Sequence, residues 1–153
     1  MAINVDDTRS ILNDLIQTCK DGQQGFQEAA NHVKDSAVRA MFLEYSQQRS
    51  RFAGELQQEV MALGGDPEKS GSTMGALHRG WIDFKSKVTG QSDAAAIHEA
   101  ESGEDAAVNA YQKALEKPLP NDIRDLIEGQ YQSVRQAHAR VRSLEVRTSG
   151  GAA

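Results

Sequence analysis

One helical stripe in the second half of the chain contains two carboxylates where a hydrophobic core is expected. Its members recur at alternating steps of four and three residues, which is the spacing of one face of an α-helix. They are Ile97, Glu101, Glu104, Val108, Tyr111 and Leu115. A buried carboxylate costs several kcal/mol unless it is paired, metal-bound or protonated. The stripe therefore predicts a helix whose buried face carries charged groups that need partners.

Three further segments show the same spacing, so the sequence predicts an all-α protein. We expect helices over residues 6–34, 36–63, 93–117 and 120–146. Asp6 or Asp7 is the expected N-cap of the first helix, and Ser92 or Asp93 that of the third. The glycines and proline of residues 64–67 are typical of a helix end, here that of the second helix.

The lengths of the connections favour two hairpins joined by a crossover. Few residues separate the first helix from the second, or the third from the fourth, which is typical of antiparallel neighbours. Residues 64–92 are long enough to run back along the bundle, and their amphipathic stretch predicts a short helix near 74–89. This is the arrangement of a ferritin-like antiparallel four-helix bundle. We expect one domain over residues 1–147 and a disordered tail over 148–153.

Composition narrows the class of protein. The formal net charge of −5 argues against non-specific nucleic-acid binding, which needs a basic face. No apolar run approaches the roughly 20 residues of a membrane span, and no signal-peptide pattern is visible. We therefore expect a cytoplasmic protein with no nucleic-acid or membrane partner. Cys19 is the single cysteine, and its place on an apolar stripe predicts an inert core thiol.

Hairpin register predicts a polar layer in the middle of the bundle. Residues equally distant from a hairpin loop face each other, so Arg49 should lie beside Gly22, Glu104 beside Gln132 and Glu101 beside Arg135. All four helices then contribute polar groups at one depth: Asp21, Gln48, Arg49, Arg51, Glu101, Glu104, Gln132 and Arg135.

Three interpretations of this layer differ in chemistry. The favoured one is a structural ion-pair network, in which an arginine binds Glu101 or Glu104 with forked geometry. The second is a residual metal site formed by Glu101, Glu104 and Asp21, with His98 as a further ligand. The third is exposure of both glutamates through a rotated third helix. His138 lies more than one turn from the layer and is expected to be a satisfied boundary histidine.

The layer is similar to the site of the di-iron ferritin-like proteins, but its ligand pattern is altered. Those proteins place a glutamate on each of two helices and Glu-x-x-His on each of the other two. Here Gln48-x-x-Arg51 and Gln132-x-x-Arg135 stand where Glu-x-x-His is expected. Arginine cannot coordinate iron because it offers no free lone pair. We therefore predict no cofactor, with iron or manganese as the alternative.

The whole chain also resembles an uncharacterised bacterial family of ferritin-like four-helix-bundle proteins, a domain of unknown function. Residues 21–26, 63–67, 78–83 and 101–106 carry the resemblance. The resemblance implies a four-helix-bundle fold, a bacterial source and, by family setting, a role in stress, and it supplies no activity. We expect a non-enzymatic structural or protein-interaction protein; the alternative is a metal-binding or oxidoreductase relative of the di-iron proteins.

Two further expectations concern packing. Ferritin-like bundles often pair along a helical face, so we expect a homodimer, with Leu77, Trp81 and Phe84 as its apolar contacts; an additional protein partner has no signature in the sequence. Glycine costs roughly 1 kcal/mol against alanine inside a helix. Three glycines in predicted helices should therefore give close helix approach or room for an arginine: Gly22, Gly25 and Gly103.

Overall fold

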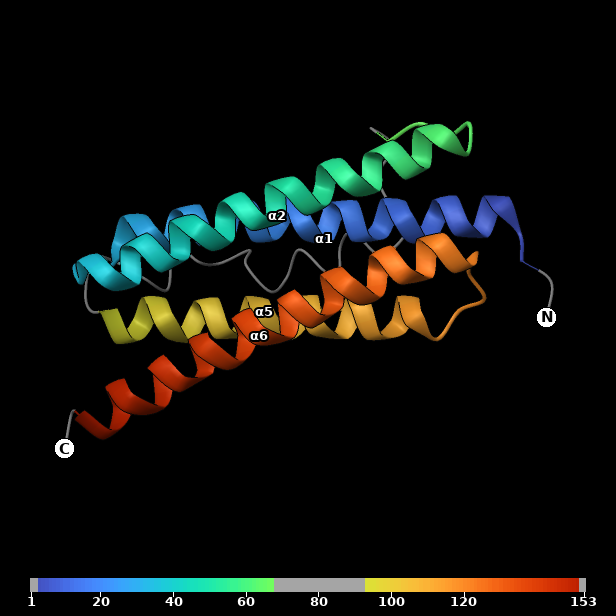
Figure 1. The fold of residues 1–153 in the computed structure, drawn as a ribbon. Helices are drawn as coiled ribbons and strands as arrows, with labels where there is room; N and C mark the ends of the chain where they lie inside the picture. Colours follow the sequence, from blue (N-terminus) through green and yellow to red (C-terminus); the bar gives the residue numbers. More distant parts are fainter. Residues whose placement is uncertain (1–2, 68–92, 152–153) are drawn as a thin grey trace.

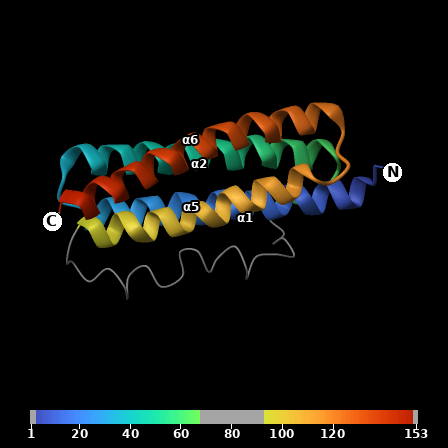
Figure 2. The ribbon, with the colours of Figure 1, turned by 90° about the horizontal axis from the view of Figure 1, so that it is seen from below.

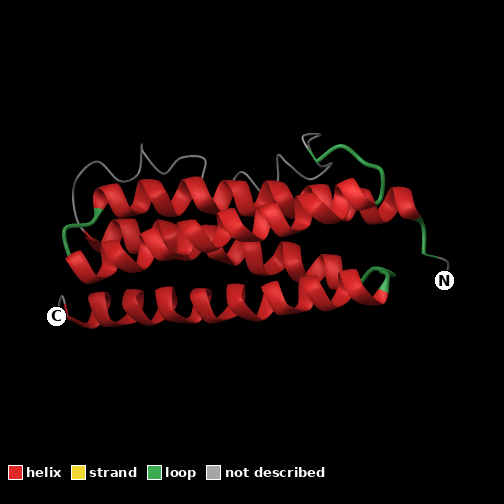
Figure 3. Cartoon of the chain, turned by 45° about the horizontal axis from the view of Figure 1, so that its top comes forward, coloured by secondary structure: helices red, strands yellow, loops and turns green. Residues whose placement is uncertain are grey.

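The computed structural model describes residues 3–67 and 93–151, with side chains described as far as Glu145. These residues form four α-helices and no strand: α1 Val5–His32, α2 Ser36–Ala62, α5 Asp93–Leu115 and α6 Asn121–Gly151. Figure 3 shows the helical content of this part of the chain. The short helix expected near residues 74–89 lies outside the described residues, as do the expected dimer contacts Leu77, Trp81 and Phe84.

The helices pack as two layers of two. Figure 2 shows α2 and α6 in one layer and α1 and α5 in the other. α1 packs against both α2 and α5, α5 packs against α6, and α2 and α6 are more loosely apposed. Figure 1 shows that α2 and α5 run in one direction and that α1 and α6 run in the other. Every packed pair is therefore antiparallel, while α2 and α5 lie diagonally across the bundle.

The start of α1 is capped by Asn4, and the expectation of Asp6 or Asp7 was wrong. The Oδ1 atom of Asn4 accepts hydrogen bonds from the backbone N–H groups of Asp6 and Asp7, at 2.8 and 3.2 Å. The two aspartates instead occupy the first turn, where negative charge interacts favourably with the helix dipole. Asparagine is as good an N-cap as aspartate, so the helix begins one position earlier than expected.

The end of α2 agrees with its glycine signal. Gly64 has a φ of 75°, which places it in the left-handed region, and the N–H of Gly65 donates to the carbonyl of Val60 at 2.9 Å. This is the long hydrogen bond of a Schellman motif. Arg9 of α1 adds a hydrogen bond from Nη1 to the carbonyl of Leu63, 2.6 Å away. The C-terminus of α2 is thereby attached to the first turns of α1.

The C-terminal ends of α5 and α6 both differ from the expected ones. α5 ends at Leu115, where Arg124 donates to the free carbonyls of Leu115 and Lys117 at 2.9 and 2.6 Å. α6 continues to Gly151, beyond the expected end of the fourth helix at residue 146. No proline follows Asn121 to interrupt the backbone hydrogen bonds of this helix.

The buried apolar residues form two clusters along the bundle axis. The first lies toward the N-terminal half of α1 and contains Leu12, Leu15, Ile16, Cys19, Ala53, Leu56, Val60, Ala107, Tyr111, Ala114, Leu119, Ile123, Ile127 and Val134. The second lies toward its C-terminal half and contains Phe26, Ala29, Ala30, Val33, Phe42, Tyr45, Ala96, Ile97, Ala100, Ala137 and Val141. On α2 and α5 the boundary between the clusters falls at Arg49 and Glu104. The polar centre therefore separates two apolar halves.

The buried residues of α2 and α5 define which face of each helix packs against the core. α2 buries Phe42, Arg49 and Leu56, which recur every seven residues along one of its faces. α5 is rotated from the expected stripe, because its buried face is rich in small residues: Ala96, Ala100, Gly103, Ala107 and Ala114. Glu101 consequently lies at the edge of the core. None of the helices in the described residues is long and apolar enough to cross a membrane.

Candidate functional site

A buried ion pair between α2 and α5 occupies the centre of the bundle. Nη1 of Arg49 lies 2.5 Å from Oε1 of Glu104, and Nη2 lies 2.7 Å from Oε2. The side chains are 1% and 0% exposed. The guanidinium fork matches the two carboxylate oxygens, which is the strongest geometry for such a pair. α2 and α5 have no backbone packing with each other, so this pair connects two helices across the diagonal of the bundle.

The surroundings of Arg49 hold its guanidinium in place. Its Nε donates to Oε1 of Gln48 at 3.2 Å, and its Cζ lies 5.4 Å from the centre of the Phe26 ring, within range of a cation–π interaction. Burial acts to lower the pKa of Arg49, but the charge of Glu104 and the hydrogen bonds to it outweigh that effect. The pKa of Arg49 is therefore raised above its ordinary value, and the arginine stays charged.

Gly22 of α1 makes room for this arginine. A Cβ atom at position 22 would lie 3.2 Å from Nη1 and 3.4 Å from Cγ of Arg49. Both distances are at the tight end of van der Waals contact. Gly22 thus has one of the two roles expected for it, space for an arginine in the polar layer.

A second buried network crosses all four helices beside the ion pair. The hydroxyl of Tyr111 donates to Oε1 of Gln130 at 2.8 Å, and Nε2 of Gln130 donates to Oε1 of Glu55 at 2.9 Å and to the carbonyl of Phe52 at 3.3 Å. Sγ of Cys19 lies 3.1 Å from the Tyr111 oxygen. Since the hydroxyl proton is engaged by Gln130, the thiol is the donor in that contact. The network runs from a buried thiol to an exposed glutamate.

Burial determines the acidity of the two groups at the inner end of this network. Desolvation raises the pKa of Cys19 from 9.0 to about 11, despite the opposing effects of Tyr111 and Arg49. Desolvation also raises the pKa of Tyr111 well above 10.0, and Cys19 adds to that shift. The thiolate is the nucleophilic form of cysteine. Cys19 is consequently unreactive at neutral pH, in agreement with its expected role as a core thiol.

Several residues expected in the polar layer lie elsewhere. Arg51, Gln132 and Arg135 are exposed. Arg51 lies two residues after Arg49 and Gln132 two after the buried Gln130, and two residues rotate a helix by roughly 200°, to the opposite face. Arg135 lies over the ring of Tyr131, 5.6 Å from its centre. Gln132 donates a hydrogen bond to Glu128 on its own helix. Gln130 occupies the buried position that was expected for Gln132.

The α5–α6 register is also shifted from the expected one. Sequence symmetry about the loop places Glu101 beside Arg135, whereas the structure places it beside His138. Side chains lean toward the N-terminus of their own helix. On α5 that direction leads away from the loop and on α6 toward it, so a residue of α5 meets one farther along α6 than loop symmetry predicts. The contact between Tyr111 and Gln130 is displaced in the same direction.

The four candidate metal ligands do not converge. Asp21 is buried on α1 and accepts a hydrogen bond from Nε2 of Gln17 at 2.9 Å. Both oxygens of Glu104 are engaged by Arg49. His98 forms a hydrogen bond with Oε1 of Glu145 on α6 at 3.0 Å. Glu101 lies beside His138 instead.

A different group of ligand-type side chains meets between α5 and α6. Nε2 of His138 lies 2.6 Å from Oδ1 of Asp105 and 3.4 Å from Oε1 of Glu101. In the described part of the chain, these are the only three such groups whose ligand atoms all lie within 4.8 Å of one another. Asp105 was not singled out from the sequence. Its position four residues after Glu101, on the same helical face, is the signal that could have identified it.

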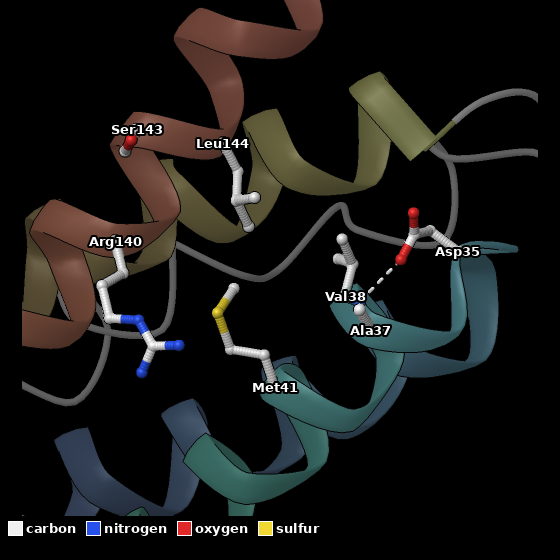
Figure 4. A pocket seen from close by; sticks show the side chains of 7 residues that line it. All are labelled: Asp35, Ala37, Val38, Met41, Arg140, Ser143 and Leu144. Carbon is white, nitrogen blue, oxygen red and sulfur yellow. Dashed lines mark hydrogen bonds between the residues drawn. The ribbon is translucent and has the colours of Figure 1, made fainter.

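A shallow groove separates the start of α2 from the end of the described part of α6. It has a volume of about 360 Å³ and is lined by Asp35, Ala37, Val38, Met41, Arg140, Ser143 and Leu144. Figure 4 shows Met41 and Leu144 extending toward each other across the opening, with Arg140 at one side and Asp35 near the far end. The carboxylate of Asp35 caps α2 by accepting from the N–H of Val38. The groove contains none of the polar-centre residues.

This geometry limits the chemistry of the centre. Arg49 takes the position from which a metal ion would approach Glu104, and a guanidinium has no lone pair for a metal. The nearby thiol is protonated at neutral pH. Within the described residues, the centre resembles a structural polar layer more closely than a catalytic site.

Comparison with protein families identifies the family of this chain. Residues 7–117 match a family described as Domain of unknown function (DUF2383). The chain belongs to this family. The match includes Arg49, Glu104, Cys19 and Tyr111 but ends before α6, and therefore before Gln130. No curated protein matches the chain.

Proposed function

We propose that this member of the family is a non-enzymatic, ferritin-like helical bundle that serves as a structural or protein-interaction module. The observation that carries the proposal is the fully buried Arg49–Glu104 pair. The pair lies between the two apolar clusters, and di-iron ferritin-like proteins likewise build their metal sites in the bundle core, from side chains on facing helices. A positive side chain in that position opposes cation binding and satisfies the completely buried carboxylate of Glu104.

The pair supports a structural role because it specifies how the helices fit together. A buried ion pair contributes little net stability, since desolvation offsets most of the attraction. Mismatched packing, however, leaves both charges buried without partners, which is strongly unfavourable. The Arg49–Glu104 pair thus favours a single alignment of α2 with α5, two helices that share no backbone packing. A rigid bundle with fixed helix faces is suited to presenting a surface to a partner.

Metal titration distinguishes this proposal from a di-iron role. Purified chain is analysed for metal content and then titrated anaerobically with Fe²⁺ and Mn²⁺ by calorimetry, alongside Glu104→Gln. We expect no binding that depends on Glu104 and no iron-oxidation activity. Stoichiometric Fe²⁺ or Mn²⁺ that is lost in Glu104→Gln would favour the metalloprotein alternative. Glu99→Gln, on the same helix but outside the pair, is the matched control.

The expected homodimer remains a prediction. Its proposed contacts lie outside the described residues, and light scattering over a range of protein concentrations tests it directly. A mass that stays monomeric at high concentration would rule it out.

A further inference from the structure

We propose that Glu101, Asp105 and His138 form a binding site for one divalent transition-metal ion, with Zn²⁺ as the best-matched ion, at the junction of α5 and α6. This site is separate from the central ion pair and is absent from the expectations drawn from the sequence. Its three ligand atoms, one imidazole nitrogen and two carboxylate oxygens, already lie within 4.8 Å of one another.

The helices bring these three groups close together. Glu101 and Asp105 are four residues apart, so both carboxylates lie on one face of α5. The antiparallel α6 places the imidazole of His138 against them, at 3.4 and 2.6 Å. In a tetrahedral zinc site the ligand atoms lie roughly 3.3 Å apart, as follows from metal–ligand bonds of about 2.0–2.2 Å. Metal entry therefore requires only a small separation of His138 from Asp105.

The burial of the ligands is graded from the core to the surface. The side chains of His138 and Glu101 are 17% and 16% exposed, whereas that of Asp105 is 57% exposed. Two ligands are thus held by the packed helices, and the third faces solvent, from which an ion can enter. Water can fill the remaining coordination position on that side, as in zinc sites with three protein ligands.

The charge balance of the cluster favours a cation. Two carboxylates converge on one imidazole nitrogen, which can carry a single proton. Even a protonated histidine leaves one negative charge uncompensated among these three groups. A divalent ion neutralises both carboxylates, and the proton on Nε2 leaves to solvent or moves to Nδ1 so that the nitrogen lone pair can bind the metal.

The identity of the ligands selects the kind of ion. Imidazole nitrogen with carboxylate oxygen suits zinc and neighbouring first-row metals, whereas Ca²⁺ and Mg²⁺ prefer oxygen ligands alone. Affinity at such a site rises from Mn²⁺ through Fe²⁺ to Co²⁺, and Cu²⁺ binds more tightly than Zn²⁺, so affinity alone does not select the ion. Zn²⁺ matches the site by geometry, because it accepts a tetrahedral set of imidazole nitrogen, carboxylate oxygen and water and has no redox chemistry. Zn²⁺ is therefore the appropriate probe, and Co²⁺ can report the geometry through its visible absorption spectrum.

The test uses the full chain freed of metal with a chelator and titrated with Zn²⁺ by calorimetry. We expect one saturable site, together with an increase in the thermal unfolding midpoint that depends on Zn²⁺ concentration. His138→Ala and Asp105→Asn should each weaken binding by more than roughly tenfold, the smallest loss typical of disturbing even an outer-shell partner. Asp105 is mostly exposed, so its variant stays informative if His138→Ala folds poorly.

His98→Ala is the matched control. His98 belongs to the same helix pair but faces the single carboxylate of Glu145, so its loss should leave Zn²⁺ affinity unchanged. Absence of saturable binding overturns the proposal, as does binding that survives both His138→Ala and Asp105→Asn. Zn²⁺ binding that is lost in Glu104→Gln but retained in Asp105→Asn would instead overturn the proposed function, because the metal would then occupy the centre.

Discussion

Gly22 and Arg49 are complementary across the α1–α2 interface. The side chain of Arg49 fills the space that a side chain at position 22 would need. A Cβ atom at position 22 would lie 3.2 Å from Nη1 of Arg49. The guanidinium cannot easily move away, because both of its terminal nitrogens bond Glu104. A glycine within a helix, which is unfavourable in isolation, thus has a structural reason in a residue on the next helix.

Gly22→Ala should consequently destabilise the protein. Alanine improves helix propensity by up to about 1 kcal/mol, but overpacking against the fixed guanidinium costs roughly 1–3 kcal/mol. We expect a net loss of about 1 kcal/mol in the free energy of unfolding, measured with urea. In the background Arg49→Met, Glu104→Leu the same substitution should be stabilising, because a flexible methionine can yield.

Gly129→Ala is the control for that experiment. A Cβ atom at position 129 of α6 would meet nothing within 4 Å, so alanine there should stabilise by roughly 0.5–1 kcal/mol in both backgrounds. If Gly22→Ala and Gly129→Ala stabilise the unmodified chain equally, the proposed complementarity between Gly22 and Arg49 is wrong.

Breaking the central pair from one side should be far more harmful than replacing it. Arg49→Met leaves Glu104 buried without a counter-charge, which should lower the free energy of unfolding by roughly 3–5 kcal/mol. Arg49→Met combined with Glu104→Leu removes both charges and should cost much less. Urea denaturation of the two single variants and the double variant measures the coupling between the positions.

Arg135→Met serves as the control for the central pair. Arg135 is exposed on α6, and changes at such positions usually alter stability by less than about 0.5 kcal/mol. Single variants at Arg49 and Glu104 that are as mild as Arg135→Met would show that water reaches the pair in solution and relieves the unpaired charge.

The sequence was sufficient to predict the helices that use large apolar residues. Leu12, Leu15 and Phe26 on α1, and Ile123 and Ile127 on α6, recur at helical spacing and are buried. These side chains are large, and their spacing leaves one orientation that buries them all. The presence of a buried arginine–glutamate pair followed from the same spacing, together with the cost of an unpaired charge.

The sequence was less informative where small residues form the core. The buried face of α5 follows Ala100 and Ala107, and alanine is common on both buried and exposed helix faces. That ambiguity allowed a rotation that moves Glu101 from the core to its edge. On α6 the expected register depended on loop symmetry and ignored the lean of side chains, so it selected Gln132 in place of Gln130 and missed the approach of His138 to Asp105.

The His98–Glu145 contact should give a small, pH-dependent link between α5 and α6. The hydrogen bond to Glu145 raises the pKa of His98 above 6.5, with partial opposition from desolvation. A raised folded-state pKa means that the stabilisation is fully present below about pH 6.5 and is lost as the pH rises through the folded pKa. His98 is 61% exposed, so solvent screening limits the effect to less than about 1 kcal/mol.

Nuclear magnetic resonance titration of the histidine ring checks this prediction. Glu145→Gln should lower the pKa of His98 toward its ordinary value and remove the corresponding pH dependence of unfolding. Identical titration midpoints in the two proteins would show that Glu145 does not hold the imidazolium.

The Cys19–Tyr111–Gln130 network should make Tyr111→Phe costly and leave the thiol inert. Loss of the hydroxyl leaves the amide oxygen of Gln130 and the thiol of Cys19 without their buried partner, which should cost about 1–3 kcal/mol. Tyr131→Phe is the matched control, since the Tyr131 hydroxyl accepts from Gln112 at an exposed position and its loss should have little effect on the urea midpoint.

Thiol chemistry tests the same network independently. Because burial raises the pKa of Cys19 to about 11, folded protein at pH 8 should react with a disulfide reagent much more slowly than protein in denaturant. The raised pKa also predicts loss of stability at alkaline pH: the unfolded thiol ionises above about pH 9, and the folded one only near pH 11. Cys19→Ala should remove this part of the alkaline slope. Rapid labelling of the folded protein at pH 8 would contradict the buried, protonated thiol on which the network depends.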